Sequence, residues 1–500
     1  MISIKLEPLG ISLKVRKDTA LRDILFDYGV EFPCGGQGLC RGCIIKVLEG
    51  EIPISDYDRQ ALTKEEIKQG LRLACHARVK EPLVIELAQW NMNILSDDSR
   101  IRVKSREGLG IVVDLGTTTI VIQLLDLRSG NVLGVRTILN PQARFGADIM
   151  SRIEFALKDK GAKTLRDLVR SKIRKEIDNL LCNTSLQDEL PLLNIVLVGN
   201  TAMHHLFCGI DTLPLSRYPF EPVNDGVFHL SAESLDWKLP GNPTVTFLPC
   251  LGGFVGSDIL AGILAIGMHE SSSLIGLIDL GTNGEVVFGN KDKIVCASTA
   301  AGPAFEGAKI SMGKRATIGA ISRVKVNSGK LECSVIGNVV PDGICGSGLV
   351  DAIAAGLKLG HITSRGKLTC IGGKFTILNP VSISQADIRE TQLAKGAIAA
   401  GVELLLKRMN VKHSEIDKVH LAGAFGNYID PVHAVEIGLC DFAVEKLESA
   451  GNTALKGAKI ALFESDGNFL FEDLLSRIEH VPLAADPMFQ DVFVENMLFR

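Results

Sequence analysis

The chain has 500 residues, of which 46% are hydrophobic and 22% are charged, and its formal net charge is −4. This length exceeds what one hydrophobic core supports, so it predicts two or three domains. The small net charge argues against nucleic acid or an anionic membrane as a partner. The N-terminus lacks the pattern of a signal peptide, and no apolar run reaches the about 18 residues that span a bilayer. We therefore expect a cytoplasmic protein.

Residues 1–92 have the pattern of a small α+β domain. Its predicted elements are, in chain order, a β-hairpin over residues 2–15, a helix capped by Thr19, a strand over 43–50, a short helix opened by the capping box of Thr63 and Glu66, and a strand over 83–87. This order, with a cysteine-rich loop before the third strand, is typical of the ubiquitin-like β-grasp fold.

Four of the twelve cysteines are spaced as metal-cluster ligands, in a C-x5-C-x2-C loop followed by one distant cysteine. They are Cys34, Cys40, Cys43 and Cys75. Glycines in the loop let the backbone turn its N–H groups toward the sulfurs of a bound cluster. The spacing predicts a [2Fe–2S] cluster of the plant or adrenodoxin ferredoxin type. A zinc site is the alternative, but zinc sites usually pair two C-x2-C units, whereas Cys75 has no such neighbour.

The remaining eight cysteines are scattered singly through the chain. Disulfide frameworks are rare in intracellular proteins, so we expect these residues to be small buried hydrophobic side chains. They are Cys182, Cys208, Cys250, Cys296, Cys333, Cys345, Cys370 and Cys440.

An internal repeat lies beyond a polar segment, residues 93–108, that has no periodicity and is predicted to be a linker. Residues 109–500 alternate strand and helix patterns, which predicts α/β architecture. Within them, residues 111–123 and 276–288 share Asp-Leu-Gly-Thr between apolar runs, 165 residues apart. The repeat predicts two similar lobes that face each other.

Each copy of the repeat places an aspartate at a strand end, followed by a tight turn. Such a turn directs backbone N–H groups and hydroxyls at an anion, while the aspartate can hold Mg²⁺ through water. A third turn, in residues 421–430, has small residues on which a base or ribose could lie. The predicted nucleotide-binding residues are Gly116, Thr117, Thr118 and Thr119 after Asp114; Gly281, Thr282, Asn283, Gly284 and Glu285 after Asp279; and Gly423, Ala424 and Gly426. The glycine spacing is neither that of a P-loop nor that of a Rossmann fingerprint.

Together the three turns resemble the ASKHA superfamily of acetate and sugar kinases, Hsp70 and actin. The resemblance implies a two-lobed α/β fold with ribonuclease H-like lobes and ATP in the cleft between them. It implies the following contacts: Mg²⁺ and the attacking water at Asp114 and Asp279, phosphates at Thr117, Thr118, Thr282 and Asn283, and adenosine at residues 423–426. The alternative for the threonine hydroxyls is that they only stabilise the turns.

Two further features have less specific patterns. His204 and His205 would point about 100° apart on a helix, so we expect packing in the core and no shared metal. Residues 301–307 and 342–353 are predicted strand-to-helix turns close to the cleft. Cys345 in the second turn has no identifiable basic partner and is expected to be buried.

The chain as a whole resembles the reductive activators of corrinoid proteins, which join an N-terminal [2Fe–2S] domain to an ASKHA ATPase. The resemblance is carried by the cysteine loop and by IVVDLGTTT, NPQARFGADIMSRI, VGNTAMHHLF, LPCLGGFVGSD, DLGTNGE, AGPAFEG, CGSGL and LAGAFGNYID. It implies that an electron passes, with ATP hydrolysis, from the [2Fe–2S] cluster to cob(II)amide and regenerates cob(I)amide for methyl transfer. The implied partners are a corrinoid protein (a methyltransferase subunit or corrinoid iron–sulfur protein), a low-potential electron donor and a second copy in a homodimer.

The sequence departs from some members of this family. No domain is inserted between the predicted ferredoxin and ATPase parts, and no [4Fe–4S] cysteine motif follows Cys440. Three other function classes stay open at this point: an activator of a radical dehydratase, a metabolite kinase with a redox sensor, and an ATP-dependent chaperone for cofactor insertion. The first of these lacks a ferredoxin domain, so the four N-terminal cysteines argue against it.

Overall fold

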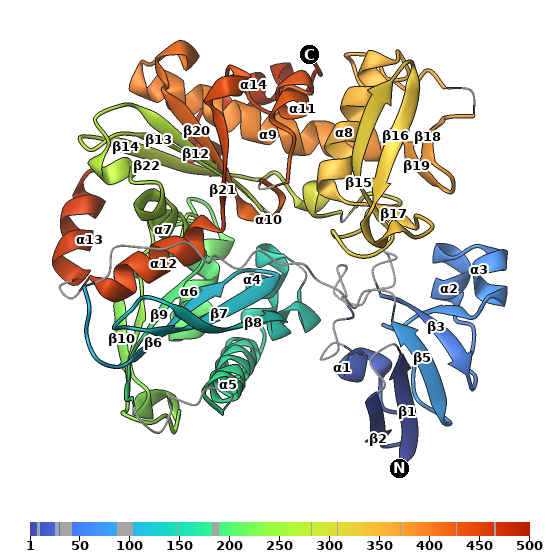
Figure 1. Ribbon diagram of the computed structural model, residues 1–500, viewed down its shortest axis with the longest axis horizontal. Coiled ribbons are helices and arrows are strands. Elements are labelled where there is room, and N and C mark those ends of the chain that lie inside the picture. The colour runs from blue at the N-terminus through green and yellow to red at the C-terminus, as the bar shows by residue number, and fades with distance from the viewer. Residues whose placement is uncertain are drawn as a thin grey trace.

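The computed structural model describes residues 1–7, 11–25, 30, 43–87, 104–146, 148–182, 190–281, 283–307, 309–370, 372–426, 428–464 and 467–500, without the side chains of residues 11, 424 and 467–470. Residues 8–10, Cys34, Cys40, most of the predicted linker and Thr282 lie outside the described residues. Figure 1 shows a small N-terminal domain, in blue, beside a larger body with two lobes.

The N-terminal domain has a five-stranded sheet in the order β2-β1-β5-β3-β4, which is the predicted β-grasp. Its elements are β1 (Ile2–Glu7), β2 (Ile11–Val15), α1 (Leu21–Leu25), β3 (Ile44–Glu49), α2 (Asp56–Ala61), α3 (Lys64–Lys68), β4 (Leu71–Leu73) and β5 (Leu83–Leu87). β1 pairs antiparallel with β2 and parallel with β5, which confirms the hairpin and the last strand. Thr19 differs from its prediction, because its hydroxyl donates to the Arg16 carbonyl at 2.8 Å and closes the turn before α1.

Capping boxes begin both α2 and α3. The predicted box is present: the Thr63 hydroxyl accepts the N–H of Glu66 at 3.2 Å, and the Glu66 carboxylate accepts the N–H of Thr63 at 2.8 Å. A second box joins Ser55 to Asp58. The buried Asp58 carboxylate also accepts the N–H of Leu73 at 2.8 Å, so it ties α2 to β4.

Each lobe of the larger body contains a six-stranded sheet, in the orders β10-β11-β9-β6-β7-β8 and β21-β20-β12-β13-β14-β22. The first has β6 (Leu109–Leu115), β7 (Thr119–Asp126), β8 (Val132–Leu139), β9 (Leu192–Val198), β10 (Phe228–Ser231) and β11 (Thr244–Phe247); the second has β12 (Ile275–Leu280), β13 (Gly284–Gly289), β14 (Ile294–Thr299), β20 (Lys418–Ala422), β21 (Leu447–Gly451) and β22 (Ile478–His480). In both, an antiparallel triplet (β6-β7-β8 or β12-β13-β14) continues into two parallel strands. The predicted duplication is therefore confirmed.

Helices α7 (Ser257–Ala265) and α12 (Thr453–Phe463) lie between the two sheets (Figure 1). They cross closely, because a Cβ on Gly457 would lie 1.9 Å from the Ala261 carbonyl oxygen. Their apolar side chains share one core with Val121 of β7 and Leu277 of β12. This shared core holds the two lobes with their first hairpin turns facing each other.

Further helices belong to the two lobes, and one of them, α10, carries Gly423 and Phe425 of the cavity wall. They are α4 (Ile149–Ala156), α5 (Gly161–Cys182), α6 (Thr201–Cys208), α9 (Gln385–Met409), α10 (Gly423–Gly426), α11 (Pro431–Glu436), α13 (Gly467–Ser476) and α14 (Phe489–Glu495). No helix in the described part of the chain is long and apolar enough to cross a membrane.

An insertion between β14 and α9 builds one border of the cleft. It consists of β15 (Ala320–Asn327), β16 (Lys330–Val335), β17 (Gly343–Ile344), α8 (Gly346–Lys358), β18 (Lys374–Leu378) and β19 (Val381–Ser384). The predicted turn over 301–307 precedes the insertion, and the one over 342–353 joins β17 to α8 within it. Phe305, Cys345 and Ser347 from these turns reach the cavity wall.

The end of the predicted linker is bound along the larger body. The N–H of Arg106 donates to the Leu127 carbonyl at 3.2 Å, and its guanidinium donates to the Leu462 carbonyl at 2.7 Å. Lys104 pairs with Glu464 at 2.6 Å. The chain is therefore already held by the ATPase part when it enters β6.

Candidate nucleotide and iron–sulfur sites

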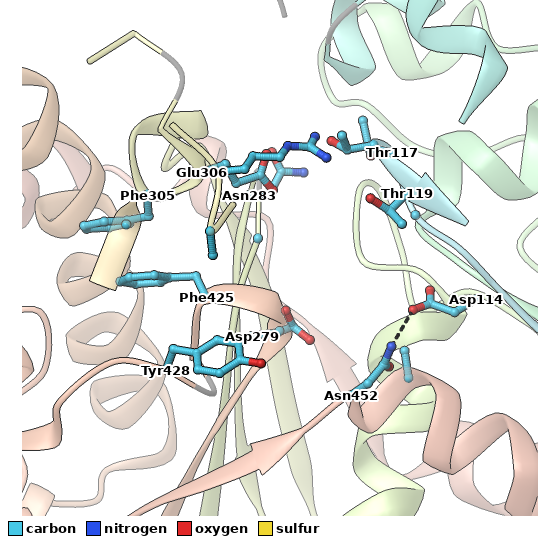
Figure 2. Close-up of a pocket in the computed structure, with 18 of the residues that line it drawn as sticks. Asp114, Thr117, Thr119, Asp279, Asn283, Phe305, Glu306, Phe425, Tyr428 and Asn452 are labelled. Carbon is cyan, nitrogen blue, oxygen red and sulfur yellow. Dashed lines mark hydrogen bonds between the residues drawn. The ribbon is translucent and has the colours of Figure 1, made fainter. Parts of the chain in front are cut away.

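A cavity of about 290 Å³ lies between the lobes, and its wall contains parts of all three predicted turns. The predicted residues that line it are Asp114, Gly116, Thr117, Thr118, Thr119, Asp279, Gly281, Asn283, Glu285 and Gly423. Figure 2 shows Asp114, Thr117 and Thr119 on one side, across from Phe425 and Tyr428. The fold thus brings together turns that are far apart in the sequence.

Two predicted residues are absent from the cavity wall. A Cβ on Gly284 would lie 2.5 Å from the Ile398 side chain, and one on Gly426 would lie 3.3 Å from the Leu421 backbone. Close packing inside the second lobe therefore accounts for both glycines. Two other predicted residues stay untested, because Thr282 and the side chain of Ala424 are outside the described part of the chain.

The two hairpin turns are closed by matching hydrogen bonds. The N–H of Gly116 donates to the Thr119 carbonyl, and the N–H of Gly281 donates to the Asn283 carbonyl, each at 3.0 Å. A Cβ on Gly116 would lie 2.7 Å from the carbonyl oxygen that its own N–H contacts. The Thr117 hydroxyl accepts from Nδ2 of Asn200 at 2.9 Å, which leaves its own proton to donate toward the cavity.

Gly423 lets the third turn approach the second carboxylate. Its φ is +83°, in the left-handed region that favours glycine. A Cβ at this position would lie 2.6 Å from Oδ1 of Asp279. A side chain here would displace either the turn or the carboxylate, so the glycine shapes the site itself.

Four carboxyl groups, those of Asp114, Asp258, Asp279 and Glu285, line the cavity. Burial raises the pKa of Asp114 to about 6, although a hydrogen bond from Asn452 opposes this rise. Burial and the neighbouring Asp114 raise the pKa of Asp279 to about 7. Burial, with Asp279 and Asp114, raises the pKa of Asp258 to about 8, and the pKa of Glu285 lies well above its ordinary value for similar reasons.

Buried carboxyl groups that raise each other's pKa form a suitable environment for a divalent cation. In the described ranges, no three His, Cys, Asp or Glu side chains converge as a direct ligand set. Mg²⁺ commonly keeps several waters and binds through one or two carboxylates and substrate phosphates. The donor set therefore fits Mg²⁺ held together with a nucleotide.

Asp258 and Asn452 are site residues that the sequence reasoning did not select. Asp258 lies in the first turn of α7, and Asn452 caps α12, where its Oδ1 accepts the N–H of Leu455 at 2.8 Å. The motif LPCLGGFVGSD ends on Asp258, so its Gly-Ser-Asp sequence before an apolar helix was the available signal. Asn452 had only the pattern of an ordinary helix cap.

An aromatic wall faces the phosphate turns. The rings of Phe305 and Phe425 are stacked, with centroids 4.9 Å apart and planes 4° apart. Tyr428 lies beside them and is 41% exposed (Figure 2). Flat apolar side chains opposite hydroxyls and carboxylates suit a ligand that is aromatic at one end and anionic at the other.

Two of the predicted cluster ligands lie at the same end of the N-terminal sheet. Ile44 of β3 pairs with Leu73 of β4, so Cys43 before β3 and Cys75 after β4 are neighbours. The N–H of Ala74 donates to the Cys43 carbonyl at 3.0 Å, and both cysteines are buried. Two thiols held together at a strand end fit the cluster; Cys34 and Cys40 lie outside the described residues.

The two adjacent histidines pack in the core of the first lobe, as predicted. Both rings are buried, and Nδ1 of His205 lies 2.9 Å from the Thr201 carbonyl oxygen. Burial lowers the pKa of His204 to about 4, so this ring is neutral. Packing in the core therefore accounts for the pair.

The eight isolated cysteines are less uniformly buried than predicted. Cys345 is buried at the cavity wall, with Sγ 3.3 Å from Oγ of Ser347. Four of the eight are buried: Cys250, Cys296, Cys345 and Cys440. Three are half-buried, namely Cys208, Cys333 and Cys370, and Cys182 is exposed. The prediction was wrong for Cys182, because this residue is the last of α5.

Comparison with known proteins accounts for most of the chain. Residues 4–80 match the 2Fe-2S iron-sulfur cluster binding domain, residues 109–271 the RACo middle region, and residues 273–500 the C-terminal domain of RACo, the ASKHA domain. RamQ, a corrinoid activation enzyme of Eubacterium limosum, is 37% identical over an alignment of 433 residues, and the alignment covers 79% of this chain and 71% of RamQ. The chain belongs to the reductive activators of corrinoid proteins.

Two more comparisons agree with the assignment of this chain to the corrinoid activators. The Co(II) methylated amine-specific corrinoid protein reductase of Methanosarcina barkeri is 26% identical over 416 residues, covering 77% of the activator and 76% of that protein. A solved structure of a reductive activator for a corrinoid, iron-sulfur protein has a TM-score of 0.70 at 28% identity, covering 100% of the activator and 98% of that chain. The fold is therefore a [2Fe–2S] domain followed by an ASKHA ATPase domain.

Proposed function

We propose that this activator uses ATP hydrolysis to drive the one-electron reduction of cob(II)amide to cob(I)amide on a corrinoid protein. The observation that supports this most is the union of two sites in one chain: a [2Fe–2S] domain and an ASKHA cleft lined by facing Asp-Leu-Gly-Thr turns. The names of its relatives, a corrinoid activation enzyme and a corrinoid protein reductase, point to the same reaction.

The coupling to ATP follows from redox arithmetic. A one-electron transfer loses a factor of ten in equilibrium for about every 59 mV that it runs uphill. Plant-type clusters have potentials of about −400 mV. An acceptor about 120 mV lower would be only about 1% reduced beside an equimolar donor pair. An ATP-dependent change in the complex allows a larger fraction of the acceptor to be reduced.

We assign roles in the cleft by chemistry and position. Asp114 and Asp279 hold Mg²⁺ through water, and Thr117, Thr118 and Asn283 donate to the phosphates. Asp258 acts on the attacking water, because its carboxyl lines the same cavity and interacts electrostatically with Asp114 and Asp279. The aromatic wall, Phe305, Phe425 and Tyr428, contacts the base.

The N-terminal domain provides the redox centre of this proposal. The [2Fe–2S] cluster, when bound, supplies a single low-potential electron. Its thiolate ligands are Cys34, Cys40, Cys43 and Cys75. Three further points stay predictions: the division into residues 1–92, 93–108 and 109–500, the homodimer, and the low-potential electron donor. Gel filtration with light scattering tests the homodimer.

The test is anaerobic reduction of a corrinoid protein in the cob(II)amide state. With a low-potential reductant and Mg·ATP, the cob(II)amide absorption should convert to that of cob(I)amide. Asp279→Asn should abolish the conversion while the cluster spectrum stays normal. Asp292→Asn, the same substitution in the exposed β13–β14 turn, is the matched control and should behave as wild type. Equal conversion without ATP would contradict the proposal.

The same assay separates the other classes of function. A chaperone for cofactor insertion should still act after Cys40→Ser, whereas a reductase should not. A metabolite kinase should show ATP turnover that rises with a small hydroxylated or carboxylate compound and does not depend on the corrinoid protein.

A further inference from the structure

Two residues of the first lobe are packed into the core of the ferredoxin domain. Leu139, the last residue of β8, is 6% exposed and belongs to the same hydrophobic cluster as the predicted ligands Cys43 and Cys75. Ala143 also packs against this cluster. Figure 1 shows the ferredoxin domain beside the first lobe, with α1 on the side of that lobe. The two domains are therefore in direct apolar contact.

The next residue in the chain, Asn140, is bound to the first phosphate turn. Asn140 is fully buried. Its N–H donates to the Thr118 carbonyl at 2.9 Å, and its Nδ2 donates to the Gly116 carbonyl at 2.9 Å. Leu139 itself pairs with Thr119 in the β7–β8 ladder. Leu139, whose side chain enters the ferredoxin core, is therefore next in the chain to Asn140, which is hydrogen-bonded to the turn that lines the nucleotide cavity.

The segment that carries Ala143 is a short rigid unit. Residues Pro141–Arg144 form a 3₁₀ helix capped by Asn140, whose Oδ1 accepts the N–H of Gln142 at 3.0 Å. The buried Gln142 amide donates to the Leu165 carbonyl of α5 at 3.1 Å. Since this segment is short and internally bonded, we expect a displacement of the phosphate turn to shift Leu139 and Ala143 as well.

We propose that Leu139 and Ala143 transmit the nucleotide state of the cleft to the iron–sulfur domain, with Asn140 as the link to the phosphate turn. The proposal rests on the proposed function only in that the cleft binds Mg·nucleotide and the N-terminal domain holds a [2Fe–2S] cluster. Leu139, Asn140 and Ala143 are positioning residues, because none of them is among the residues that line the nucleotide cavity.

Coupling between two sites is reciprocal for equilibrium binding. If nucleotide changes the reduction potential of the cluster, then reduction of the cluster must change nucleotide affinity by the same factor. A fivefold change in affinity corresponds to a shift of about 41 mV, because tenfold corresponds to about 59 mV for one electron. Two independent measurements on the isolated protein therefore have to agree.

The experiment uses the full-length holoprotein without any corrinoid partner. Calorimetry gives the dissociation constant of Mg·ADP and of a non-hydrolysable ATP analogue with the cluster oxidised and reduced. Spectroelectrochemical titration gives the cluster potential with and without each nucleotide. In wild type we expect at least one nucleotide to bind about fivefold or more differently to the two redox states, with a matching shift of about 41 mV or more.

The variants decide whether this contact carries the effect. Leu139→Ala should bring the affinity ratio to within twofold of one, with the cluster still present. Leu133→Ala, the same substitution in the same strand but against the core of the first lobe, should keep the wild-type ratio. If Leu139→Ala loses its cluster, Asn140→Ala cuts the link from the other side and should also lose the ratio.

Three results would overturn the inference: a wild-type ratio of one, a full ratio in a cluster-containing Leu139→Ala protein, or a full ratio in Asn140→Ala. Failure of the proposed function is distinguishable from all three. A protein that shows the redox-dependent affinity but never forms cob(I)amide would refute the corrinoid reaction and leave the coupling intact.

Discussion

Nδ2 of Asn452 donates a hydrogen bond to Oδ2 of Asp114 at 3.1 Å, which joins the start of α12 to the end of β6 (Figure 2). Asn452 thus has two roles, because its Oδ1 also caps α12. The bond opposes the rise in the Asp114 pKa that burial causes. It therefore keeps available the charge that Mg²⁺ requires.

Removal of this bond should weaken nucleotide binding. A hydrogen bond to a charged group is worth about 1.5–3 kcal/mol, so Asn452→Ala should raise the Mg·ADP dissociation constant about tenfold or more. Asn452→Ser retains a good helix cap but has a shorter side chain. Calorimetry should find both variants weakened and only Asn452→Ala less stable to heat. Wild-type affinity in Asn452→Ser would refute the role of this bond.

Gly423→Ala should disable the cleft while leaving the cluster intact. The new Cβ would lie 2.6 Å from Oδ1 of Asp279 at a φ of +83°, so the substitution adds a clash to backbone strain. Gly360→Ala is the control, because Gly360 has a φ of +73° but no atom within 4 Å of the added Cβ. We expect ATPase activity to fall about a hundredfold or more only in Gly423→Ala. A similar loss in both would attribute the effect to strain alone.

The carboxyl cluster predicts how stability varies with pH in the absence of Mg²⁺. The pKa of Asp279 is raised to about 7 and that of Asp258 to about 8, whereas an unfolded aspartate titrates at about 3.9. Between about pH 4 and 8 the native state therefore binds more protons than the unfolded state, and stability falls as pH rises.

Thermal unfolding from pH 5.5 to 8.5 measures this slope. Asp258→Asn should flatten it between pH 6 and 8, and saturating Mg·ADP should raise stability most at the alkaline end. An unchanged slope in Asp258→Asn would show that this carboxyl is already ionised in the cation-free protein.

Loss of a cluster ligand should leave the nucleotide site intact. Cys75→Ser should lower the iron content from two per chain and remove the rhombic signal of the reduced cluster, because a thiolate ligand is lost. Cys333→Ser changes a half-buried cysteine in β16 and should keep both iron atoms. Mg·ADP binding to the oxidised protein should persist in both variants. Stoichiometric zinc in wild type would contradict the cluster assignment.

The sequence predicted best those features whose signal is local. The strand over 83–87 has the predicted bounds, and the two Asp-Leu-Gly-Thr turns were found because each is a short hairpin between apolar strands. Their meeting at one cavity followed from the repeat, since duplicated lobes place equivalent turns opposite each other.

The features that were missed depend on tertiary structure. Asp258 and Asn452 belong to helices between the lobes, and nothing in their local sequence states which carboxylate they will meet. Gly284 and Gly426 lie beside predicted turns yet pack into the second lobe, a distinction that only the fold makes. The contact of Leu139 with the ferredoxin core joins residues from different domains and leaves no periodic pattern.

One single-turnover measurement tests the central claim most directly. The activator is reduced, freed of excess reductant and mixed anaerobically with a corrinoid protein in the cob(II)amide state, with and without Mg·ATP. We expect one cob(I)amide per cluster oxidised, and only with Mg·ATP. Equal cob(I)amide formation without ATP, or formation without loss of the reduced-cluster signal, would contradict the account.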